Sequence, residues 1–203
     1  MIGKNAVAKL RIVFTVLFGL IIGASLMITD SRWPDSNWFS LCSVLLGCVL
    51  VGLGAVGRLW CILYIGGYKS HALVTSGPYS ICRNPLYFFS LLGAVGVGLC
   101  TETLTLPAII LAMFAVYYPA VIRNEENVLR DRHGAEFDAY GKITPAFFPR
   151  WSRLREPEEW LAHPRVFRRC AVDALWFIWL VGIVEFAEGL HDAGILPVLA
   201  KLW

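Results

Sequence analysis

Two polar segments carry most of the residues in this sequence that could do chemistry. They read GGYKSHALVTSGPYSICRNP over residues 66–85 and RNEENVLRDRHGAEFDAYGKITPAFFPRW over residues 123–151. Tyrosine and arginine occur in both segments, and the second adds glutamates. Aromatic faces attract cations, guanidinium groups bind carboxylates, and carboxylates bind ammonium groups. These are the side-chain types that hold a charged ligand.

Glu125 is the side chain that most strongly indicates a ligand. At helical spacing it shares a face with apolar residues four positions away on either side, so its carboxylate is on the packed side. A desolvated carboxylate needs a cation or hydrogen-bond donors to offset the loss of water. Arg83 or Arg123 could supply that cation, as could the ammonium group of a ligand. Glu126 lies four residues before Arg130, where an ordinary surface ion pair explains it.

The first segment predicts a loop that enters a helix. Gly77-Pro78 is a turn signal, and Pro85 suits the first turn of a helix, which makes Asn84 its N-cap. Three further side chains cluster around that helix end: Tyr79, Arg83 and Tyr87. Each also has a purely structural explanation, as an interfacial anchor or as a cation that reaches for the membrane surface.

The elements that position these segments are membrane spans. Of 203 residues, 57% are hydrophobic and 16% charged, whereas a soluble domain carries about 25% charged residues. A bilayer core needs about 20 apolar residues per helix. The sequence therefore predicts an all-α, polytopic integral membrane protein with about five transmembrane helices. The candidate spans are Leu10–Ile28, Trp38–Tyr64, Leu86–Cys100, Leu104–Ile122 and Ala171–Glu188, the third and fourth forming a hairpin through Thr101-Glu102-Thr103.

The distribution of Lys and Arg predicts the orientation. Of the 18 basic residues, only Arg32 and Lys201 lie on one side of the predicted spans. Because basic loops stay in the cytosol, we expect a cytosolic N-terminus, in a bacterial inner membrane or an endoplasmic reticulum. A two-span hairpin separates the two polar segments, so both emerge on the cytosolic side and can build one cytosol-facing pocket. The net charge of +3 follows from this topology and indicates no nucleic acid.

The sequence predicts no metal site. Six cysteines are scattered singly, and four histidines form no H-E-x-x-H or comparable set of ligands. Gly52–Gly57 is a formal G-x-G-x-x-G, the pattern of dinucleotide-binding loops. It lies inside a predicted membrane helix, where small residues permit close helix packing. We favour packing there, with a cofactor against the bare backbone as the alternative.

In chain order, the two segments contain a characteristic series of short motifs. These are HALVTSGPY at 71–79, RNPLY at 83–87, and Glu125-Glu126 followed by Leu129, Gly134, Phe137 and Tyr140. The series resembles the isoprenylcysteine carboxyl methyltransferase and phospholipid methyltransferase superfamily over roughly residues 50–150. The resemblance implies S-adenosylmethionine as the cofactor.

The resemblance also implies which residues contact that cofactor. They are His71, Ala72, Leu73, Val74, Tyr79, Asn84, Pro85, Leu86, Tyr87 and Glu125. Tyrosine faces suit the sulfonium, and Glu125 suits the ammonium group. We add Arg83, whose guanidinium suits the cofactor carboxylate.

For the reaction, the resemblance implies methyl transfer to a lipophilic or membrane-embedded acceptor that enters between the helices. Arg123 and Asn84 are the predicted catalytic residues, with Arg123 orienting an acceptor carboxylate. Carboxyl methyltransferases have histidine where this chain has Asn84, and they place arginine one turn before the glutamate, where this chain has Val121. Phospholipid N-methyltransferases are more similar at N-P-x-Y, and their Gly-x-Gly stretch would correspond to Gly52 and Gly54.

Two other classes remain as alternatives. An NADPH-dependent sterol-type membrane reductase is similar around the 83–87 box, and a non-catalytic scaffold could keep the same fold. The methyltransferase hypothesis divides the chain into three regions. They are the first two spans (1–65), the methyltransferase core (66–151), and a basic juxtamembrane segment with the last span (152–203).

Overall fold

The structure is a computed structural model, and it describes residues 23, 29–31, 38–68 and 72–202. Helices make up most of the described chain. In order, the elements are β1 (Thr29–Ser31), α2 (Trp38–Ile65), α3 (Pro78–Ile81), α4 (Pro85–Cys100), α5 (Thr105–His133), α6 (Ala135–Ile143), the 3-10 helix η1 (Trp151–Arg153), α7 (Pro164–Ala174), α8 (Trp176–Asp192) and β2 (Ala200–Leu202).

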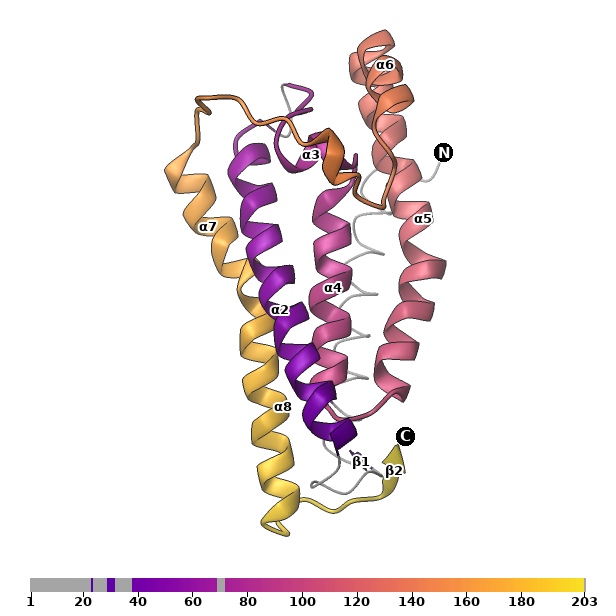
Figure 1. Cartoon of the computed structure of the whole chain (residues 1–203), viewed down its shortest axis with the longest axis vertical. Coiled ribbons are helices and arrows are strands. Elements are labelled where there is room, and N and C mark those ends of the chain that lie inside the picture. The colour runs from indigo at the N-terminus through magenta and orange to yellow at the C-terminus, as the bar shows by residue number, and fades with distance from the viewer. Residues whose placement is uncertain (1–22, 24–28, 32–37, 69–71, 203) are drawn as a thin grey trace.

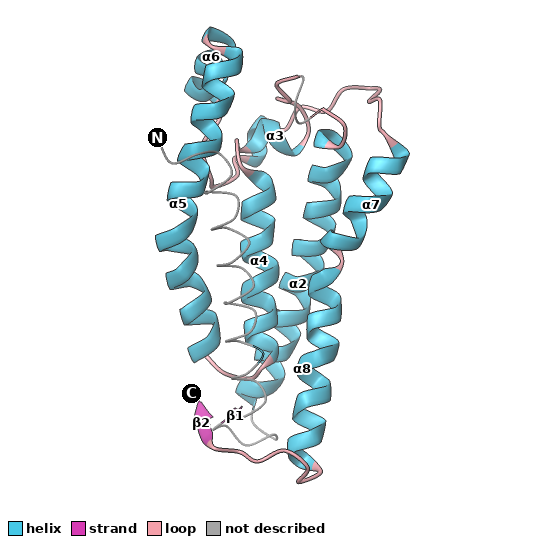
Figure 2. Cartoon of the chain, turned by 180° about the vertical axis from the view of Figure 1, so that it is seen from behind, coloured by secondary structure: helices cyan, strands magenta, loops and turns pink. Residues whose placement is uncertain are grey.

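The long helices run side by side along the molecule. Figures 1 and 2 show α2, α4, α5 and the α7–α8 pair aligned with the long axis. The short helix α3, the helix α6 and the loops around them gather at one end, whereas β1 and β2 lie at the other. The end formed by residues 72–84 and 134–163 is called the polar end below. This arrangement brings the two polar segments of the sequence together.

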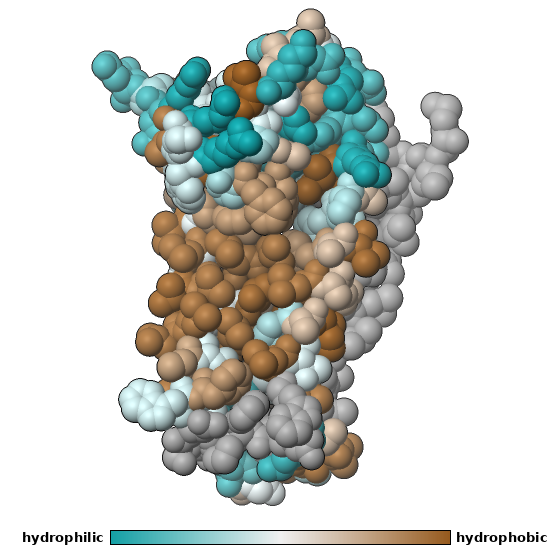
Figure 3. All heavy atoms as spheres, turned by 45° about the vertical axis from the view of Figure 1, so that its right-hand side comes forward, coloured by the Kyte–Doolittle hydropathy of each residue, from teal (hydrophilic) through white to brown (hydrophobic). Residues whose placement is uncertain are grey.

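Among the described residues, three helical stretches are long and apolar enough to cross a bilayer: Trp38–Ile65, Thr105–His133 and Pro164–Asp192. The fourth, α4, has 16 residues and is about 24 Å long, somewhat less than the ~30 Å of a hydrocarbon core. Apolar side chains form a broad band around the middle of the face in Figure 3, with hydrophilic side chains at the polar end. The chain is an all-α membrane protein, as predicted. The predicted first span lies outside the described residues, Gly23 excepted.

The predicted boundaries need two corrections. The last helical stretch begins at Pro164 instead of Ala171, and Leu175 divides it into α7 and α8. The sequence analysis assigns the arginines before Ala171 to a basic juxtamembrane segment and predicts no helix there, but Arg165, Arg168 and Arg169 lie on α7. The other correction concerns α5, which continues beyond the predicted span to His133. Glu125 therefore lies within α5, as the helical spacing predicts.

Glycines bring α2 and α4 into close contact. A Cβ built on Gly54 would lie 2.6 Å from the Cα of Gly93, and one built on Gly57 would overlap the ring of Phe89. One built on Gly52 would meet nothing within 4 Å. Helices in lipid associate closely where small residues let their backbones approach. The packing interpretation is therefore right for Gly54 and Gly57, whereas Gly52 faces open space.

The predicted hairpin between α4 and α5 is confirmed. Thr101 Oγ1 donates to the carbonyl oxygen of Gly98 at 2.7 Å and lies 3.0 Å from Thr103 Oγ1. Glu102, between the two threonines, takes the left-handed conformation with φ 53°. This tight turn makes α4 and α5 antiparallel neighbours, so the start of α4 and the end of α5 meet at the polar end.

A short parallel pairing joins two distant parts of the chain. β1 pairs with β2, with Thr29 opposite Ala200 and Ser31 opposite Leu202. The sequence predicts neither strand, because three residues are too few to show a two-residue period. The pairing lies at the end opposite the polar end, away from both polar segments (Figure 1).

Candidate cofactor site at the polar end

The loop after α2 turns sharply at Gly77. This residue has φ 58°, and a Cβ on it would overlap the ring of Tyr64. Glycine is therefore required there both by backbone conformation and by space. The chain then enters α3, where Ser80 Oγ donates to the Gly77 carbonyl oxygen at 2.6 Å. The turn places Tyr79 in a buried cluster with Tyr64 and Phe89, so the predicted turn at Gly77-Pro78 is confirmed.

An ion pair ties this loop to α5. Arg83 Nε donates to Glu126 Oε1 at 2.9 Å, and Arg83 Nη2 donates to Glu126 Oε2 at 3.3 Å. Arg83 Nη1 also donates to the carbonyl oxygen of Gly141 at 3.0 Å. The predicted pairing of Glu126 with Arg130 is wrong, since Arg130 binds Asp138 at 2.9 Å instead. The Arg83 guanidinium thus holds three elements together.

Asn84 is the N-cap residue of α4, and Pro85 takes the first turn, as predicted. The Asn84 side chain makes no capping bond. Its Nδ2 instead donates to Glu126 Oε1 at 3.2 Å and to the carbonyl oxygen of Ala146 at 2.9 Å. The amide therefore reinforces the contact between the two polar segments. This use of Asn84 depends on distant residues, so the cap pattern alone could not predict it.

Helix α6 covers the site from above. Gly134 ends α5 with φ 49°, which lets the chain turn into α6. Phe137 and Tyr140 face inward and are buried. The Tyr140 hydroxyl donates to the carbonyl oxygen of Tyr79 at 2.6 Å. Burial is the main cause that raises the pKa of both Tyr79 and Tyr140 above the ordinary value. Both phenols are therefore neutral at physiological pH.

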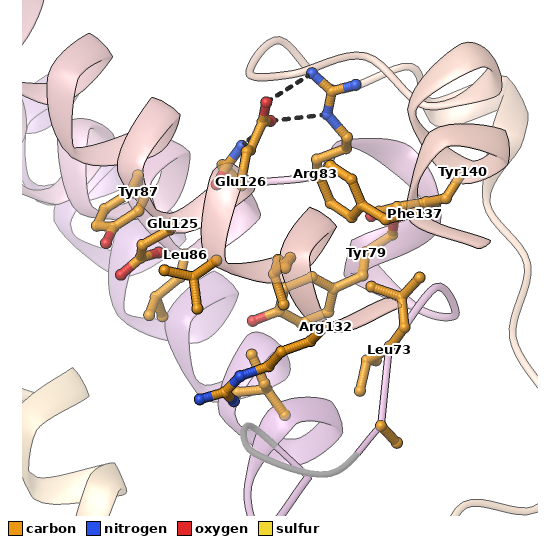
Figure 4. A pocket seen from close by; sticks show the side chains of 16 residues that line it. Leu73, Tyr79, Arg83, Leu86, Tyr87, Glu125, Glu126, Arg132, Phe137 and Tyr140 are labelled. Atoms are coloured by element: carbon orange, nitrogen blue, oxygen red, sulfur yellow. Dashed lines mark hydrogen bonds and ion pairs between the residues drawn. The ribbon is translucent and has the colours of Figure 1, made fainter. Parts of the chain in front are cut away.

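These contacts enclose a cavity of about 370 Å³ at the polar end. Its size is within the range of small-molecule sites. Its lining comes from α2, the loop before α3, α3 itself, the loop between α3 and α4, and helices α4, α5 and α6 (Figure 4). The lining residues are Ile65, Ala72, Leu73, Val74, Tyr79, Arg83, Asn84, Leu86, Tyr87, Glu125, Glu126, Val128, Leu129, Arg132, Phe137 and Tyr140.

Charges of both signs line this cavity. Figure 4 shows Glu125 beside Tyr87 and Leu86, and Arg132 on a separate part of the wall. Glu125 and Arg132 are seven residues apart on α5, hence about two turns apart on one helix face. The rings of Tyr79, Tyr87 and Phe137 are also part of the lining. The cavity therefore offers a carboxylate, a guanidinium and aromatic surfaces to a ligand.

Most of the residues predicted to contact the cofactor line this one cavity. Nine of them do so: Ala72, Leu73, Val74, Tyr79, Arg83, Asn84, Leu86, Tyr87 and Glu125. Pro85 is buried at the helix start, outside the lining. His71 lies outside the described residues. Arg123 is exposed on α5 and is not among the lining residues, so the structure does not bring it to this cavity.

Seven lining residues were not among those predicted to contact the cofactor: Ile65, Glu126, Val128, Leu129, Arg132, Phe137 and Tyr140. Val128 and Arg132 follow Glu125 at spacings of three and seven. That helical spacing was the available signal, because such residues share one face. The motif series contains Glu126, Leu129, Phe137 and Tyr140, but they were not assigned to the site. Ile65 carried no signal, since it lies at the end of an apolar span.

The remaining candidates for a ligand site are absent from this cavity. Neither Gly52 nor Gly54 is part of its lining. Among the residues that the structure describes, no group of three or more His, Cys, Asp or Glu side chains could hold a metal ion.

Fold and site define a class of protein, a helical membrane protein with a charged and aromatic cavity at one end of its bundle. The family model for phospholipid methyltransferases matches residues 42–136, which contain most of α2, all of α3, α4 and α5, and most of the cavity lining. The chain belongs to this phospholipid methyltransferase family.

Curated relatives are similar over nearly the whole chain. One is the cobalt-zinc-cadmium resistance protein CzcN of Cupriavidus metallidurans, 44% identical over 199 residues that cover 98% of this chain and 89% of that protein. Another is the nickel-cobalt-cadmium resistance protein NccN of Alcaligenes xylosoxydans xylosoxydans, 44% identical over 191 residues that cover 94% of this chain and 86% of that protein. No solved structure matches the chain at a significant level.

Proposed function

We propose that the chain is an S-adenosylmethionine-dependent membrane methyltransferase that modifies a lipophilic acceptor. The observation that carries the proposal is the convergence of nine predicted cofactor residues on one cavity of about 370 Å³. These residues come from stretches that are far apart in sequence, 72–74, 79, 83–87 and 125. A stable membrane fold alone does not require such a convergence. Membership of the phospholipid methyltransferase family supports the same function.

The residues present suit this cofactor. Glu125 would bind its ammonium group, and the faces of Tyr79, Tyr87 and Phe137 would attract its sulfonium by about 0.5–2 kcal/mol each. We reassign the cofactor carboxylate from Arg83 to Arg132, because Arg83 already forms a two-point ion pair with Glu126. The chain's task is to orient both partners and to exclude water. When bound, the cofactor supplies an electrophilic methyl group.

For the acceptor nucleophile we propose a carboxylate oxygen first and an amine nitrogen second, with a thiol sulfur left open. Our first proposal is carboxyl O-methylation, as in isoprenylcysteine carboxyl methyltransferases, because a carboxylate is already a nucleophile and needs no base. The second is N-methylation, which the match to phospholipid methyltransferases favours. Asn84 lies in the cavity wall, where it suits a positioning role. The position of Arg123 outside the lining weakens its proposed role in binding the acceptor carboxylate.

We propose that the polar end faces the cytosol. Basic residues gather at the polar end and at the adjoining ends of α5 and α7, as is typical of cytosolic segments. They are Arg83, Arg130, Arg132, Lys142, Arg150, Arg153, Arg155, Arg165, Arg168 and Arg169. In this orientation the soluble cofactor reaches the cavity from the cytosol. The acceptor arrives from the bilayer.

Calorimetric titration tests the proposed cofactor site. The purified protein in detergent should bind S-adenosylmethionine and S-adenosylhomocysteine in the micromolar range, and NADPH should give no heat. Glu125→Gln should weaken binding of S-adenosylmethionine about tenfold or more, equivalent to about 1.4 kcal/mol. Asp131→Asn is the matched control, since Asp131 is exposed on the same helix and does not line the cavity. Binding of NADPH alone would favour the reductase instead.

We also propose that the methyltransferase contributes to metal resistance, because both similar curated proteins bear that name. A strain that lacks this chain should grow less well with cobalt or cadmium. The wild-type sequence should restore growth, and the Glu125→Gln variant should not. If both sequences restore growth, metal resistance does not depend on methyl transfer.

A further inference from the structure

A second cavity lies within the membrane-spanning part of the molecule. Its volume is about 530 Å³, and its described lining comes mainly from α4, α5 and α8, with single residues of α2 and α7. Apolar side chains such as Leu106, Ile110, Leu180 and Val184 form most of its wall. This cavity is therefore suited to a long apolar chain.

One end of this cavity is charged. Arg58 lines it about two turns before the end of α2, hence at the end nearer the cofactor cavity. Ser90, in the second turn of α4, lies beside it and accepts a hydrogen bond from Arg58 Nη1. Leu106, at the start of α5, lies toward the opposite end of the bundle. Asp173 also lines the cavity beside Arg58, so the charged end carries a guanidinium and a carboxylate, and the other end is apolar, like the site of an amphiphile.

The hydrogen-bonding capacity of Arg58 is only partly used. Besides the bond to Ser90, Nη2 donates to the backbone oxygen of Asp173 at 3.4 Å, and the guanidinium lies 5.6 Å from the centre of the Phe177 ring. Nε is buried and has no hydrogen-bond partner. In the described part of the chain no carboxylate is within ion-pair distance of Arg58, the Asp173 carboxylate included. A guanidinium inside a bilayer is stabilised by an anion or by hydrogen-bond acceptors, and an anion at Arg58 would supply the partner that Nε lacks.

The two cavities are neighbours. Tyr87 lines the cofactor cavity and Tyr118 lines the apolar one, with their ring centres 5.0 Å apart in an edge-to-face arrangement. Tyr118 in turn stacks on Phe114, with ring centres 3.9 Å apart. This pair of tyrosines therefore connects the two sites. A ligand whose charged end lies at Arg58 would have that end close to the cofactor cavity.

We infer that the apolar cavity binds the methyl acceptor and that Arg58 binds an anionic group on it. The acceptor is therefore an amphiphile with a long apolar chain and a carboxylate or phosphate near its reactive end. This inference rests on the proposed methyltransferase function, and it gives Arg58 the acceptor-binding role predicted for Arg123. Arg58 acts here as a specificity-determining residue, and the cofactor binds without it.

Photo-crosslinking tests the inference. The probe is palmitate with a diazirine in its chain, added to the protein in phosphatidylcholine nanodiscs, and mass spectrometry locates the crosslinks. Unlabelled palmitate, hexadecyl phosphate and hexadecanol compete in parallel. We expect crosslinks on α5 and α8, and at least about tenfold stronger competition by either anion than by the alcohol. Equal competition by hexadecanol would overturn the inference. This comparison uses the wild-type protein and needs no variant.

Variants separate this inference from the proposed function. In the Arg58→Gln variant, competition by palmitate should weaken about tenfold. The affinity of this variant for S-adenosylhomocysteine should stay within about twofold of wild type. Arg169→Gln, which removes an exposed cation on α7, should change neither. Unchanged palmitate competition in Arg58→Gln would refute the role of Arg58, even if the cofactor binds. If the wild-type protein does not bind the cofactor, the methyltransferase function is refuted, whatever the palmitate result.

Discussion

Glu125 and Glu126 are adjacent in the sequence but have different environments, because neighbouring helix positions lie about 100° apart. Glu126 faces the loop before α4 and binds Arg83 and Asn84, whereas Glu125 lies beside Tyr87 in the cavity wall. Helical spacing predicts the inward position of Glu125. It could not predict the partner of Glu126, because Arg83 is 43 residues away, whereas Arg130 is a visible local candidate.

The Glu126 ion pair should stabilise the polar end. Hydrogen bonds to charged groups contribute about 1.5–3 kcal/mol, and both side chains are mostly buried, at 18% and 16% exposed. We expect Glu126→Gln to lower the free energy of unfolding by about 2 kcal/mol, measured by denaturation in detergent. Asp138→Asn breaks the exposed pair with Arg130 and should cost less than about 1 kcal/mol. Equal losses in the two variants would contradict this ranking.

The buried tyrosines predict how stability depends on pH. Burial raises the pKa of Tyr79 and Tyr140 above the unfolded value of about 10. Their contribution to stability is therefore complete below about pH 10 and is lost as pH rises through the folded pKa values. Thermal unfolding between about pH 8 and pH 11 should show a decline above about pH 10, and Tyr140→Phe should decline less steeply. An equally steep decline in Tyr140→Phe would contradict the assignment to Tyr140.

At the scale of elements, hydropathy predicts which stretches are helical, and local patterns fail at their ends. Helix α7 starts at Pro164, seven residues before the predicted span, because hydropathy marks only the apolar part of this helical stretch. The Gly52–Gly57 pattern predicts close packing, but it does not tell which glycines face α4. Only the rotation of α2 in the bundle decides that Gly54 meets Gly93 and that Gly52 does not.

The contact between α2 and α4 gives a matched pair of substitutions. Gly54→Ala places a methyl group against the Gly93 backbone, which cannot move aside easily, so overpacking should cost about 1–3 kcal/mol. Gly52→Ala makes the same chemical change in open space and should stay within about 0.5 kcal/mol of wild type. Thermal unfolding in detergent measures both. Similar stability of the two variants would argue against a tight α2–α4 contact.

At the scale of the whole molecule, the bundle explains why the site was largely predictable. The α4–α5 hairpin returns the chain to the polar end, so two motifs separated by a hairpin meet there. The lining residues Ala72, Tyr79, Tyr87 and Glu125 could be assigned from this logic and from the family resemblance. Arg58 could not, because its contacts with Ser90 and Phe177 come from helices far along the chain. The division into three regions stays a prediction.

The orientation of the molecule can be tested by labelling. Glu158 lies in an exposed loop at the polar end, and Gly194 is exposed just beyond α8. In a variant without other cysteines, Gly194→Cys should react with an impermeant maleimide in intact cells. Glu158→Cys should react only after permeabilisation, because we propose that the polar end faces the cytosol. The reverse pattern would show that the cavity opens outside the cell.

Methyl transfer itself is the most direct test of the proposed function. Membranes that contain the protein are incubated with S-adenosylmethionine labelled with tritium in its methyl group, and the lipids are extracted into organic solvent. We predict labelled lipid with the wild-type and Asp131→Asn proteins, and label reduced at least about tenfold with Glu125→Gln. Release of volatile label by mild base would identify a carboxyl ester, and base-stable label an amine. Lipid label equal to that of membranes without the protein, although the cofactor binds, would contradict the proposal that this chain is a methyltransferase for lipophilic acceptors.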